Sequence, residues 1–197
     1  MRFVIALILL VLAGCDKESE PKGQAQPAST AKAGASDKAD ITLESANGMR
    51  ATLSYTFAGQ KAPSAPFADA QGQDVSLADF EGKPLLLNIW ATWCAPCKAE
   101  MPTLDALAKL EKGRMSVIAV SQDLEGRAPV VAFFTETGVK NLVPYTDADN
   151  ALLTAFNNAI ALPTTILYDS DGKEVWRVAG GVEWDEAEMA KLLRAAD

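Results

Sequence analysis

Two of the three cysteines in this 197-residue chain, Cys94 and Cys97, lie three residues apart in the stretch Trp93-Cys94-Ala95-Pro96-Cys97. The residues that follow predict a helix that begins at Cys94. The free N–H groups and the dipole of a first helical turn stabilise an anion, so we expect the pKa of the Cys94 thiol to be lowered. Cys97 lies one turn further along the same face, within disulfide reach. Cys94 could therefore attack a partner disulfide, and Cys97 could then release the partner.

Three other uses of this cysteine pair stay open at this point. A zinc site needs two further ligands, and the chain has one other cysteine and no histidine. A purely structural disulfide across so short a loop constrains the unfolded chain little. Inert buried thiols fit poorly in an exported protein. Thiol–disulfide exchange explains the spacing best, and we expect no metal.

The first 14 residues, MRFVIALILLVLAG, have the pattern of a secretory signal peptide. Arg2 precedes an apolar run of ten residues, which is too short to span a hydrocarbon layer of about 30 Å. The alternative is a buried N-terminal helix. The run ends in Leu-Ala-Gly-Cys15, which resembles the bacterial lipobox. That resemblance implies cleavage before Cys15 and acylation of this cysteine, with anchoring by two or three acyl chains.

The residue after the lipobox cysteine is Asp16. In enteric lipoproteins, an aspartate at this position favours retention in the inner membrane. We therefore expect a protein anchored by lipid on Cys15 to the periplasmic face of the bacterial inner membrane.

The composition excludes several functions. Hydrophobic residues make up 49% of the chain and charged residues 22%, as in a globular protein with a core. A net charge of −8 without a basic stripe argues against a nucleic-acid partner. The absence of histidine excludes histidine general bases, histidine metal ligands and C-x-x-C-H haem attachment. We expect no cofactor.

The chain divides into four predicted segments. The signal peptide is 1–14, and the lipidated cysteine and a flexible tether are 15–40, because residues 16–40 contain no aromatic residue and no Leu, Ile or Val. Alternating apolar residues around Asn47-Gly48 predict a β-hairpin with a two-residue turn in a possible extension, 41–61. The main domain is 62–197.

Within the main domain, strands alternate with helices. A second hairpin is expected to turn near Gly72. Strands are expected at 84–90, 115–121, 142–147, 164–169 and 173–179. Helices are expected from Cys94 to about Lys112 and at 128–138, 151–159 and 183–196. The first helix should bury Met101, Leu104, Leu107 and Leu110. This order predicts an α/β fold with a mixed sheet and helices on both faces.

Two stretches of the chain resemble a known family. LLLNIWATWCAPCKAEMP (85–102) closely resembles the active-site segment of the thioredoxin superfamily, in its TlpA/ResA-like membrane-anchored branch. ALPTTILYDSDGKEVWRVAGG (161–181) resembles the cis-proline strand, hairpin and glycine loop of that superfamily. The resemblance covers about residues 62–197 and implies a thioredoxin-like fold.

The resemblance also implies roles for single residues. Cys94 would be the exposed nucleophile and Cys97 the buried resolving thiol of a redox disulfide. Trp93, whose alternative role is ordinary packing, and Pro96 would border the substrate groove. Pro163 would be the cis-proline that faces the disulfide.

The main chain of Leu162 would then pair with an extended substrate segment. Pro102 would bend the active-site helix. Thioredoxin has a buried aspartate where this chain has Asn88, and an amide cannot act as a base. Glu100 matches a glutamate near the cysteines of some members, where it would relay protons. Its alternative role is a solvated helix carboxylate.

The expected function is a membrane-anchored periplasmic thiol–disulfide oxidoreductase that reduces disulfides of exported proteins. Apocytochrome c cysteines or copper-site thiols are the clients typical of the branch, and a membrane thiol transporter would supply the electrons. Strong oxidants often carry histidine between the cysteines, and its absence here favours a reductant. The alternatives are an oxidase or isomerase of exported proteins, and a redox-inert binding lipoprotein with a thioredoxin fold. A peroxidase is disfavoured, since no separate peroxidatic cysteine is present.

Overall fold

The computed structural model describes residues 38–157 and 160–196. The predicted signal peptide, Cys15 and residues 16–37 of the predicted tether lie outside the described residues. The described residues fall in one unit, Lys32–Asp197. Among them, no helix combines the length and the hydropathy that crossing a bilayer requires.

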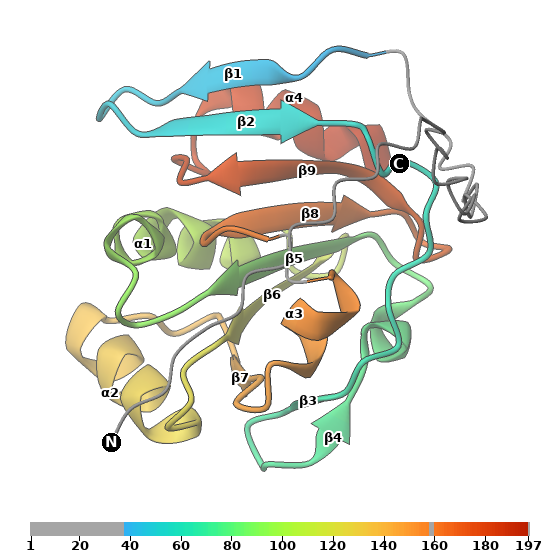
Figure 1. Cartoon of the computed structure of the whole chain (residues 1–197). Helices are drawn as coiled ribbons and strands as arrows, with labels where there is room; N and C mark the ends of the chain where they lie inside the picture. Colours follow the sequence, from blue (N-terminus) through green and yellow to red (C-terminus); the bar gives the residue numbers. More distant parts are fainter. Residues whose placement is uncertain (1–37, 158–159, 197) are drawn as a thin grey trace, which may run out of the picture. The chain divides into compact units, whose positions relative to one another are not determined.

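The described residues form a nine-stranded mixed sheet in the order β1-β2-β9-β8-β5-β6-β7-β3-β4 (Figure 1). The strands are β1 (Ile41–Glu44), β2 (Arg50–Ser54), β3 (Phe67–Ala68), β4 (Asp74–Val75), β5 (Leu85–Trp90), β6 (Ser116–Ser121), β7 (Pro144–Thr146), β8 (Thr164–Tyr168) and β9 (Glu174–Gly180). β5, β6 and β7 are parallel, and the other pairs are antiparallel. This arrangement confirms the predicted mixed sheet.

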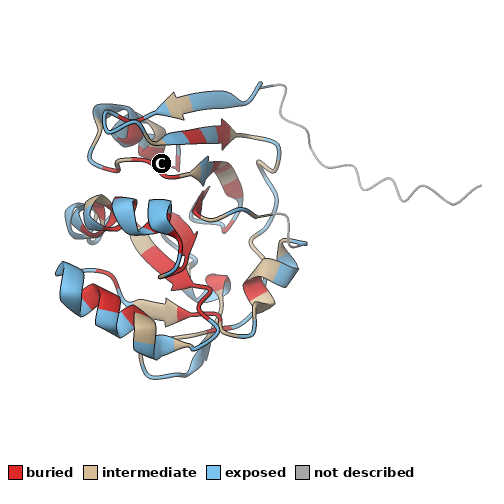
Figure 2. Ribbon diagram, turned by 60° about the vertical axis from the view of Figure 1, so that its left-hand side comes forward, coloured by how far each residue is buried: buried red, intermediate tan, exposed pale blue. Residues whose placement is uncertain are grey.

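Helices cover both faces of this sheet. They are η1 (Leu77–Phe80), α1 (Ala95–Leu110), α2 (Arg127–Thr137), α3 (Ala151–Ala155), α4 (Ala187–Leu193) and η2 (Arg194–Ala196). Buried residues of α1, α2 and α4 join one hydrophobic cluster, and those of η1 and α3 join the other. Figure 1 accordingly shows α3 in front of the sheet and α4 behind it. Buried residues line the inner sides of these layers in Figure 2.

Every residue of the central strand β5 is buried, as its continuous apolar sequence predicts. Because successive side chains of a strand point to opposite faces, Leu86 and Trp90 pack in the cluster with α1. Leu87 and Ile89 pack in the cluster with α3. Asn88 has the same parity as Leu86 and Trp90, so its side chain, the one carboxamide in β5, points towards α1.

The predicted N-terminal hairpin is present, but its two-residue turn is wrong. β1 and β2 are joined by the five residues 45–49. The N–H of Ser45 donates to the Met49 carbonyl (2.9 Å), and Asn47 Oδ1 accepts the Met49 N–H (3.0 Å), so Asn47-Gly48 lies inside a larger loop. β2 pairs with β9 and buries Ala51 and Leu53, so the hairpin extends the sheet.

Three helices differ from the prediction. Leu110 is 79% exposed, whereas Met101, Leu104 and Leu107 are buried. At about 3.6 residues per turn, a spacing of three turns each side chain back by about 60°, so Leu110 has rotated away from the core. The final helix begins at Ala187. The segment before it buries Trp184, and the main-chain N–H of Trp184 donates to Thr103 Oγ1 (3.1 Å). Of the helix predicted at 151–159, residues 151–155 are helical, and 158–159 lie outside the described residues.

Candidate active site

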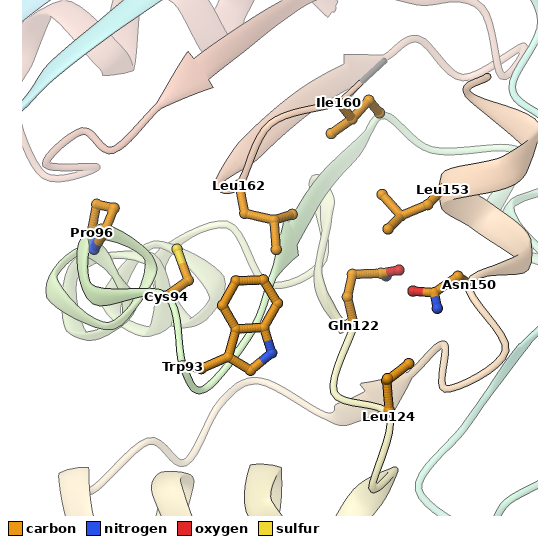
Figure 3. A pocket seen from close by; sticks show the side chains of 9 residues that line it. All are labelled: Trp93, Cys94, Pro96, Gln122, Leu124, Asn150, Leu153, Ile160 and Leu162. Atoms are coloured by element: carbon orange, nitrogen blue, oxygen red, sulfur yellow. The ribbon is translucent and has the colours of Figure 1, made fainter. Parts of the chain in front are cut away.

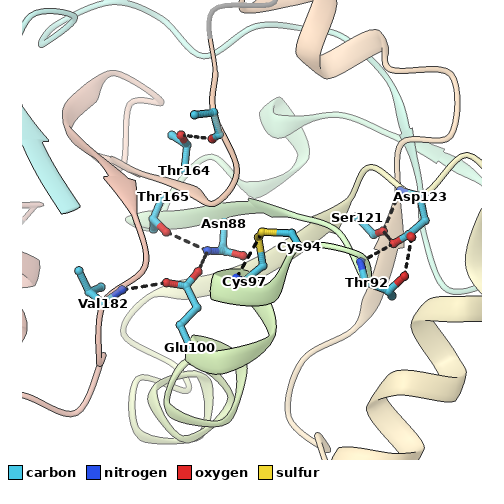
Figure 4. Close-up of a disulfide and its surroundings, with 11 residues drawn as sticks. Asn88, Thr92, Cys94, Cys97, Glu100, Ser121, Asp123, Thr164, Thr165 and Val182 are labelled. Carbon is cyan, nitrogen blue, oxygen red and sulfur yellow. Dashed lines mark hydrogen bonds between the residues drawn. A yellow bond between two sulfur atoms is a disulfide. The ribbon is translucent and has the colours of Figure 1, made fainter. Parts of the chain in front are cut away.

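The two cysteines lie where β5 passes into α1 (Figure 4). Cys94 is the N-cap of α1, and its Sγ accepts the N–H of Cys97 (3.3 Å). An N-cap side chain that accepts this N–H satisfies one of the free donors of the helix end. Cys94 and Cys97 form a disulfide, with their Cα atoms 5.3 Å apart. The sulfur of Cys94 therefore lies at the positive end of a 16-residue helix dipole.

The two sulfurs differ in accessibility. Cys97 is 0% exposed, as expected for a resolving thiol. Cys94 is only 6% exposed in the disulfide form, so its expected exposure is wrong in degree. The neighbouring Trp93 is 69% exposed and stands at the rim of the groove that Cys94 lines. A partner therefore reaches Cys94 through that groove.

A buried carboxylate that the sequence did not reveal holds the loop before Cys94. Asp123 accepts hydrogen bonds from the main-chain N–H of Thr92 (2.9 Å), from Thr92 Oγ1 (2.6 Å) and from Ser121 Oγ (2.5 Å). β5 and β6 are parallel neighbours, so the loops after them meet at the same edge of the sheet. The polar run Ser121-Gln122-Asp123, which begins at the last residue of β6, was the available signal.

Beneath the disulfide lies a buried polar cluster. Glu100, one turn after Cys97 on α1, is 0% exposed, which excludes the solvated carboxylate considered from the sequence. Its Oε1 accepts from Asn88 Nδ2 (2.7 Å), and its Oε2 accepts from the N–H of Val182 (3.1 Å). Asn88 Nδ2 also donates to Thr165 Oγ1 (2.9 Å). The cluster joins α1, β5, β8 and the segment after β9.

Burial is the main influence on the charge state of Glu100. It raises the pKa of this carboxyl to about 8, against the opposing hydrogen bonds from Val182 and Asn88. The indole of Trp184 also favours the charged form, although its Nε1 makes no direct hydrogen bond within the described residues. Glu100 therefore holds a proton at neutral pH and can release it slightly above.

The cis-proline loop faces the start of α1. The Leu162–Pro163 peptide bond is cis, as the resemblance implied. The Pro163 carbonyl accepts the N–H of Gly180 (2.9 Å), which ties the loop to β9. Gly180 has φ +108°, and a Cβ there would lie 2.5 Å from the Arg50 carbonyl oxygen. This position therefore requires glycine, because both its backbone angle and the approach of β2 exclude a side chain.

Four of the residues predicted from sequence line one groove of about 710 Å³: Trp93, Cys94, Pro96 and Leu162 (Figure 3). Cys97, Glu100 and Pro163 do not line it, and Pro102 lies inside α1. The opposite wall comes from residues that the sequence did not single out: Gln122, Leu124, Asn150, Leu153 and Ile160. They lie in the loop after β6, in or beside α3, and before the cis-proline, so their convergence depends on the tertiary fold.

Comparison with known proteins agrees with this geometry. The Redoxin family matches residues 57–193. A relative is the thiol-disulfide oxidoreductase ResA of Bacillus thuringiensis subsp. konkukian (strain 97-27), which is 34% identical over 123 residues, or 62% of this chain and 69% of the relative.

Two solved structures are also similar. One is described as a thiol:disulfide interchange protein DsbE from Chlorobium tepidum (TM-score 0.62, 25% identity, covering 71% of this chain and 98% of that one). The other is the pneumococcal exposed lipoprotein thioredoxin Etrx1 from Streptococcus pneumoniae (TM-score 0.53, 25% identity, covering 66% and 96%). The chain belongs to the Redoxin family and is a ResA-like thiol–disulfide oxidoreductase of the thioredoxin superfamily.

Proposed function

We propose that this protein is a lipid-anchored reductase of disulfides in exported proteins, and that it works at the periplasmic face of the inner membrane. The observation that carries the redox part is the position of Cys94. Its sulfur caps α1, accepts a helix N–H, borders the groove and is joined to the buried Cys97. A thiolate at this point is stabilised by the helix end and is placed to meet a client sulfur.

The exchange proceeds in two balanced steps. The Cys94 thiolate attacks one sulfur of the client disulfide, which forms a mixed disulfide and releases the other client sulfur as a thiol after it takes up a proton. The Cys97 thiolate then attacks Cys94 Sγ and releases the second client thiol. The protein gives up two electrons and is left with the Cys94–Cys97 disulfide. A membrane dithiol carrier would restore the reduced pair by the same exchange.

Glu100 is proposed to move the proton of Cys97. The thiol of Cys97 must lose its proton before the sulfur can attack, and it is buried away from water. The pKa of Glu100, raised by burial to about 8, lies close to the ordinary thiol value of about 8.5. Proton transfer between groups with similar pKa values costs little free energy. Only the deprotonated form of Glu100 can accept this proton, and this form is a minority at neutral pH that grows towards pH 8. Asn88 cannot accept the proton, but it holds Glu100 in place.

The direction of the reaction is proposed to be reduction. Strong oxidants of this superfamily owe their potential to a stabilised reduced form. Ala95 and Pro96 offer no side-chain donor that would stabilise the Cys94 thiolate. We expect a potential near that of thioredoxin, about −270 mV, and a value near −120 mV would instead support the oxidase alternative.

The location and the clients rest on sequence. Arg2, the short apolar run and Cys15 support export and lipidation, and one similar structure is itself named a lipoprotein. Cytochrome c maturation or copper-site thiols are the proposed clients. Expression with an alkyne fatty acid should label the wild-type protein and leave Cys15→Ser unlabelled and outside the membrane fraction. Equal labelling of both would reject the anchor at Cys15.

The activity is tested by insulin reduction with dithiothreitol as the electron source. Wild type should accelerate it, Cys94→Ser should not, and Cys97→Ser should accumulate a mixed disulfide. Equal turnover by wild type and Cys94→Ser would show that the pair does not catalyse exchange, and would leave the binding-lipoprotein alternative.

A further inference from the structure

In the disulfide form, the described part of the groove beside Cys94 is uncharged. None of its nine described lining residues carries a formal charge until reduction frees the Cys94 thiolate. Its walls are mainly apolar, and Figure 3 shows Trp93 and Leu162 on the side of Cys94, with Leu124, Leu153 and Ile160 across from them. Its volume, about 710 Å³, lies within the range of about 300–1,000 Å³ found for sites that enclose a small ligand. A short peptide segment with one large side chain therefore fits beside the reactive sulfur.

Among the described residues of the far wall, the polar side chains are two carboxamides, those of Gln122 and Asn150. Gln122 is 3% exposed, and neither its Oε1 nor its Nε2 makes a hydrogen bond within the described residues. A carboxamide offers one acceptor and two donors without charge, so it matches a peptide group rather than an ion. Both polar atoms of Gln122 are closed to solvent and lie near the Asp147 carboxylate, so this residue contributes an uncharged surface to the wall.

Two carboxylates lie behind this wall. Asp123 follows Gln122 in the chain and is buried in its hydrogen bonds to the Cys94 loop. Asp147 accepts from the N–H groups of Ala151 and Leu152 (2.8 and 2.9 Å) at the start of α3. Burial raises the pKa of the Asp147 carboxyl, and the nearby Gln122 carboxamide partly opposes this. Neither carboxylate lines the groove, so neither is placed to pair with a cationic client residue, whereas both disfavour an acidic one.

We infer that the groove selects client cysteines that are flanked by a large apolar residue, in an extended segment without charge beside the cysteine. The inference rests on the proposed function, because the occupant is the client of the Cys94 exchange. The groove begins at the reactive sulfur and the cis-proline loop, so a client held there by its cysteine must place its neighbouring residues against Leu153, Ile160 and Gln122. Charged flanks would lose their hydration without gaining an ionic partner among the described residues of the far wall.

The test is a series of peptide disulfides, each the symmetric disulfide of acetyl-Ser-X-Cys-Gly-amide with X as Leu, Ala, Lys or Glu. Pre-reduced protein reacts with each in a single turnover, in which one protein dithiol converts one peptide disulfide into two peptide thiols. Each rate constant is divided by that of the same peptide with dithiothreitol, which removes intrinsic differences in disulfide reactivity. We expect the normalised rate constant of the Leu peptide to exceed that of the Ala peptide by about tenfold, and those of the Lys and Glu peptides by at least as much.

Two variants in α3 locate the selection. Leu153→Ala should reduce the Leu-to-Ala ratio several-fold. Thr154→Ala, an exposed neighbour that does not line the groove, should keep the wild-type ratio. The wild-type series stands by itself if Leu153→Ala does not fold.

The outcomes separate the two claims. Rates within twofold across the series, with insulin still reduced, would overturn the selection and leave the redox function intact. A preference for Lys would overturn it in favour of steering by the net charge of −8. If the protein reduced none of the peptides and did not reduce insulin, both the selection and the redox function would be overturned.

Discussion

Glu100→Gln tests the buried acid directly. The free chain loses the Glu100 proton near the ordinary pKa of 4.5, whereas the folded protein keeps it until about pH 8. Between these values the unfolded state binds fewer protons than the folded state, so the free energy of unfolding falls as the pH rises. Because one pKa unit corresponds to about 1.36 kcal/mol, the full loss amounts to at most about 5 kcal/mol.

Glutamine removes this pH dependence but has its own cost. Its side chain has one acceptor oxygen, whereas Glu100 accepts from both Asn88 and Val182. One of these donors is left unpaired, which costs about 1–3 kcal/mol. Wild type should therefore be the more stable protein at pH 5 and Glu100→Gln the more stable at pH 9, with the two curves crossing between about pH 5.1 and 6.7.

The assay is urea unfolding of the disulfide form, followed by tryptophan fluorescence at intervals from pH 5 to pH 9. Keeping the disulfide intact removes the titration of the thiols. Glu136→Gln, an exposed glutamate on α2, is the matched control and should follow wild type at every pH. A constant difference between wild type and Glu100→Gln across this range would refute the reasoning, because it would show that Glu100 ionises alike in the folded and unfolded states.

Three further predictions follow from single contacts. Asp123→Ala removes three hydrogen bonds to Thr92 and Ser121 and should lower the free energy of unfolding, measured in urea, by about 2–4 kcal/mol. A loss below about 0.5 kcal/mol would contradict the conclusion that Asp123 holds the loop before Cys94. Gly180→Ala would place a Cβ 2.5 Å from the Arg50 carbonyl oxygen and should lower the free energy of unfolding by several kcal/mol. Its control is Gly48→Ala, with φ +84° and nothing within 4 Å of the new Cβ, which should lower it by about 1 kcal/mol. Equal losses in the two variants would show that β2 does not pack as described. Cys97→Ser should trap clients on Cys94 as bands on non-reducing gels that dithiothreitol removes, and the same bands from Cys94→Ser would reverse the assigned order of attack.

The local elements could be predicted from the sequence because each depends on neighbouring residues. The apolar run of β5, interrupted by Asn88, and the glycine after α2 indicate their elements without help from distant parts of the chain. The start of the helix at Cys94-Ala-Pro-Cys97 was also predictable from neighbouring residues alone. Two local predictions are wrong. A spacing of three residues does not keep Leu110 on the buried face of α1, and Asn47-Gly48 is part of a longer loop rather than a complete turn.

The rest of the site depends on contacts between distant residues. Val182 donates to Glu100 across 82 residues, and Asp123 accepts from Thr92 across 31. The far wall of the groove combines Gln122, Asn150 and Ile160, which no local pattern connects. The cis-proline was expected through its family resemblance, whereas the low exposure of Cys94 is a property of the folded site that no local pattern indicated.

The most direct test of the account is the rate of alkylation of the fully reduced protein by iodoacetamide, measured from pH 4 to pH 9 with the site of modification identified by mass spectrometry. We predict that Cys94 reacts first, with a midpoint below the ordinary thiol value of about 8.5, while Cys97 reacts slowly at every pH. A Cys94 midpoint at or above 8.5, or faster modification of Cys97, would contradict the proposal that the end of α1 activates the sulfur of Cys94.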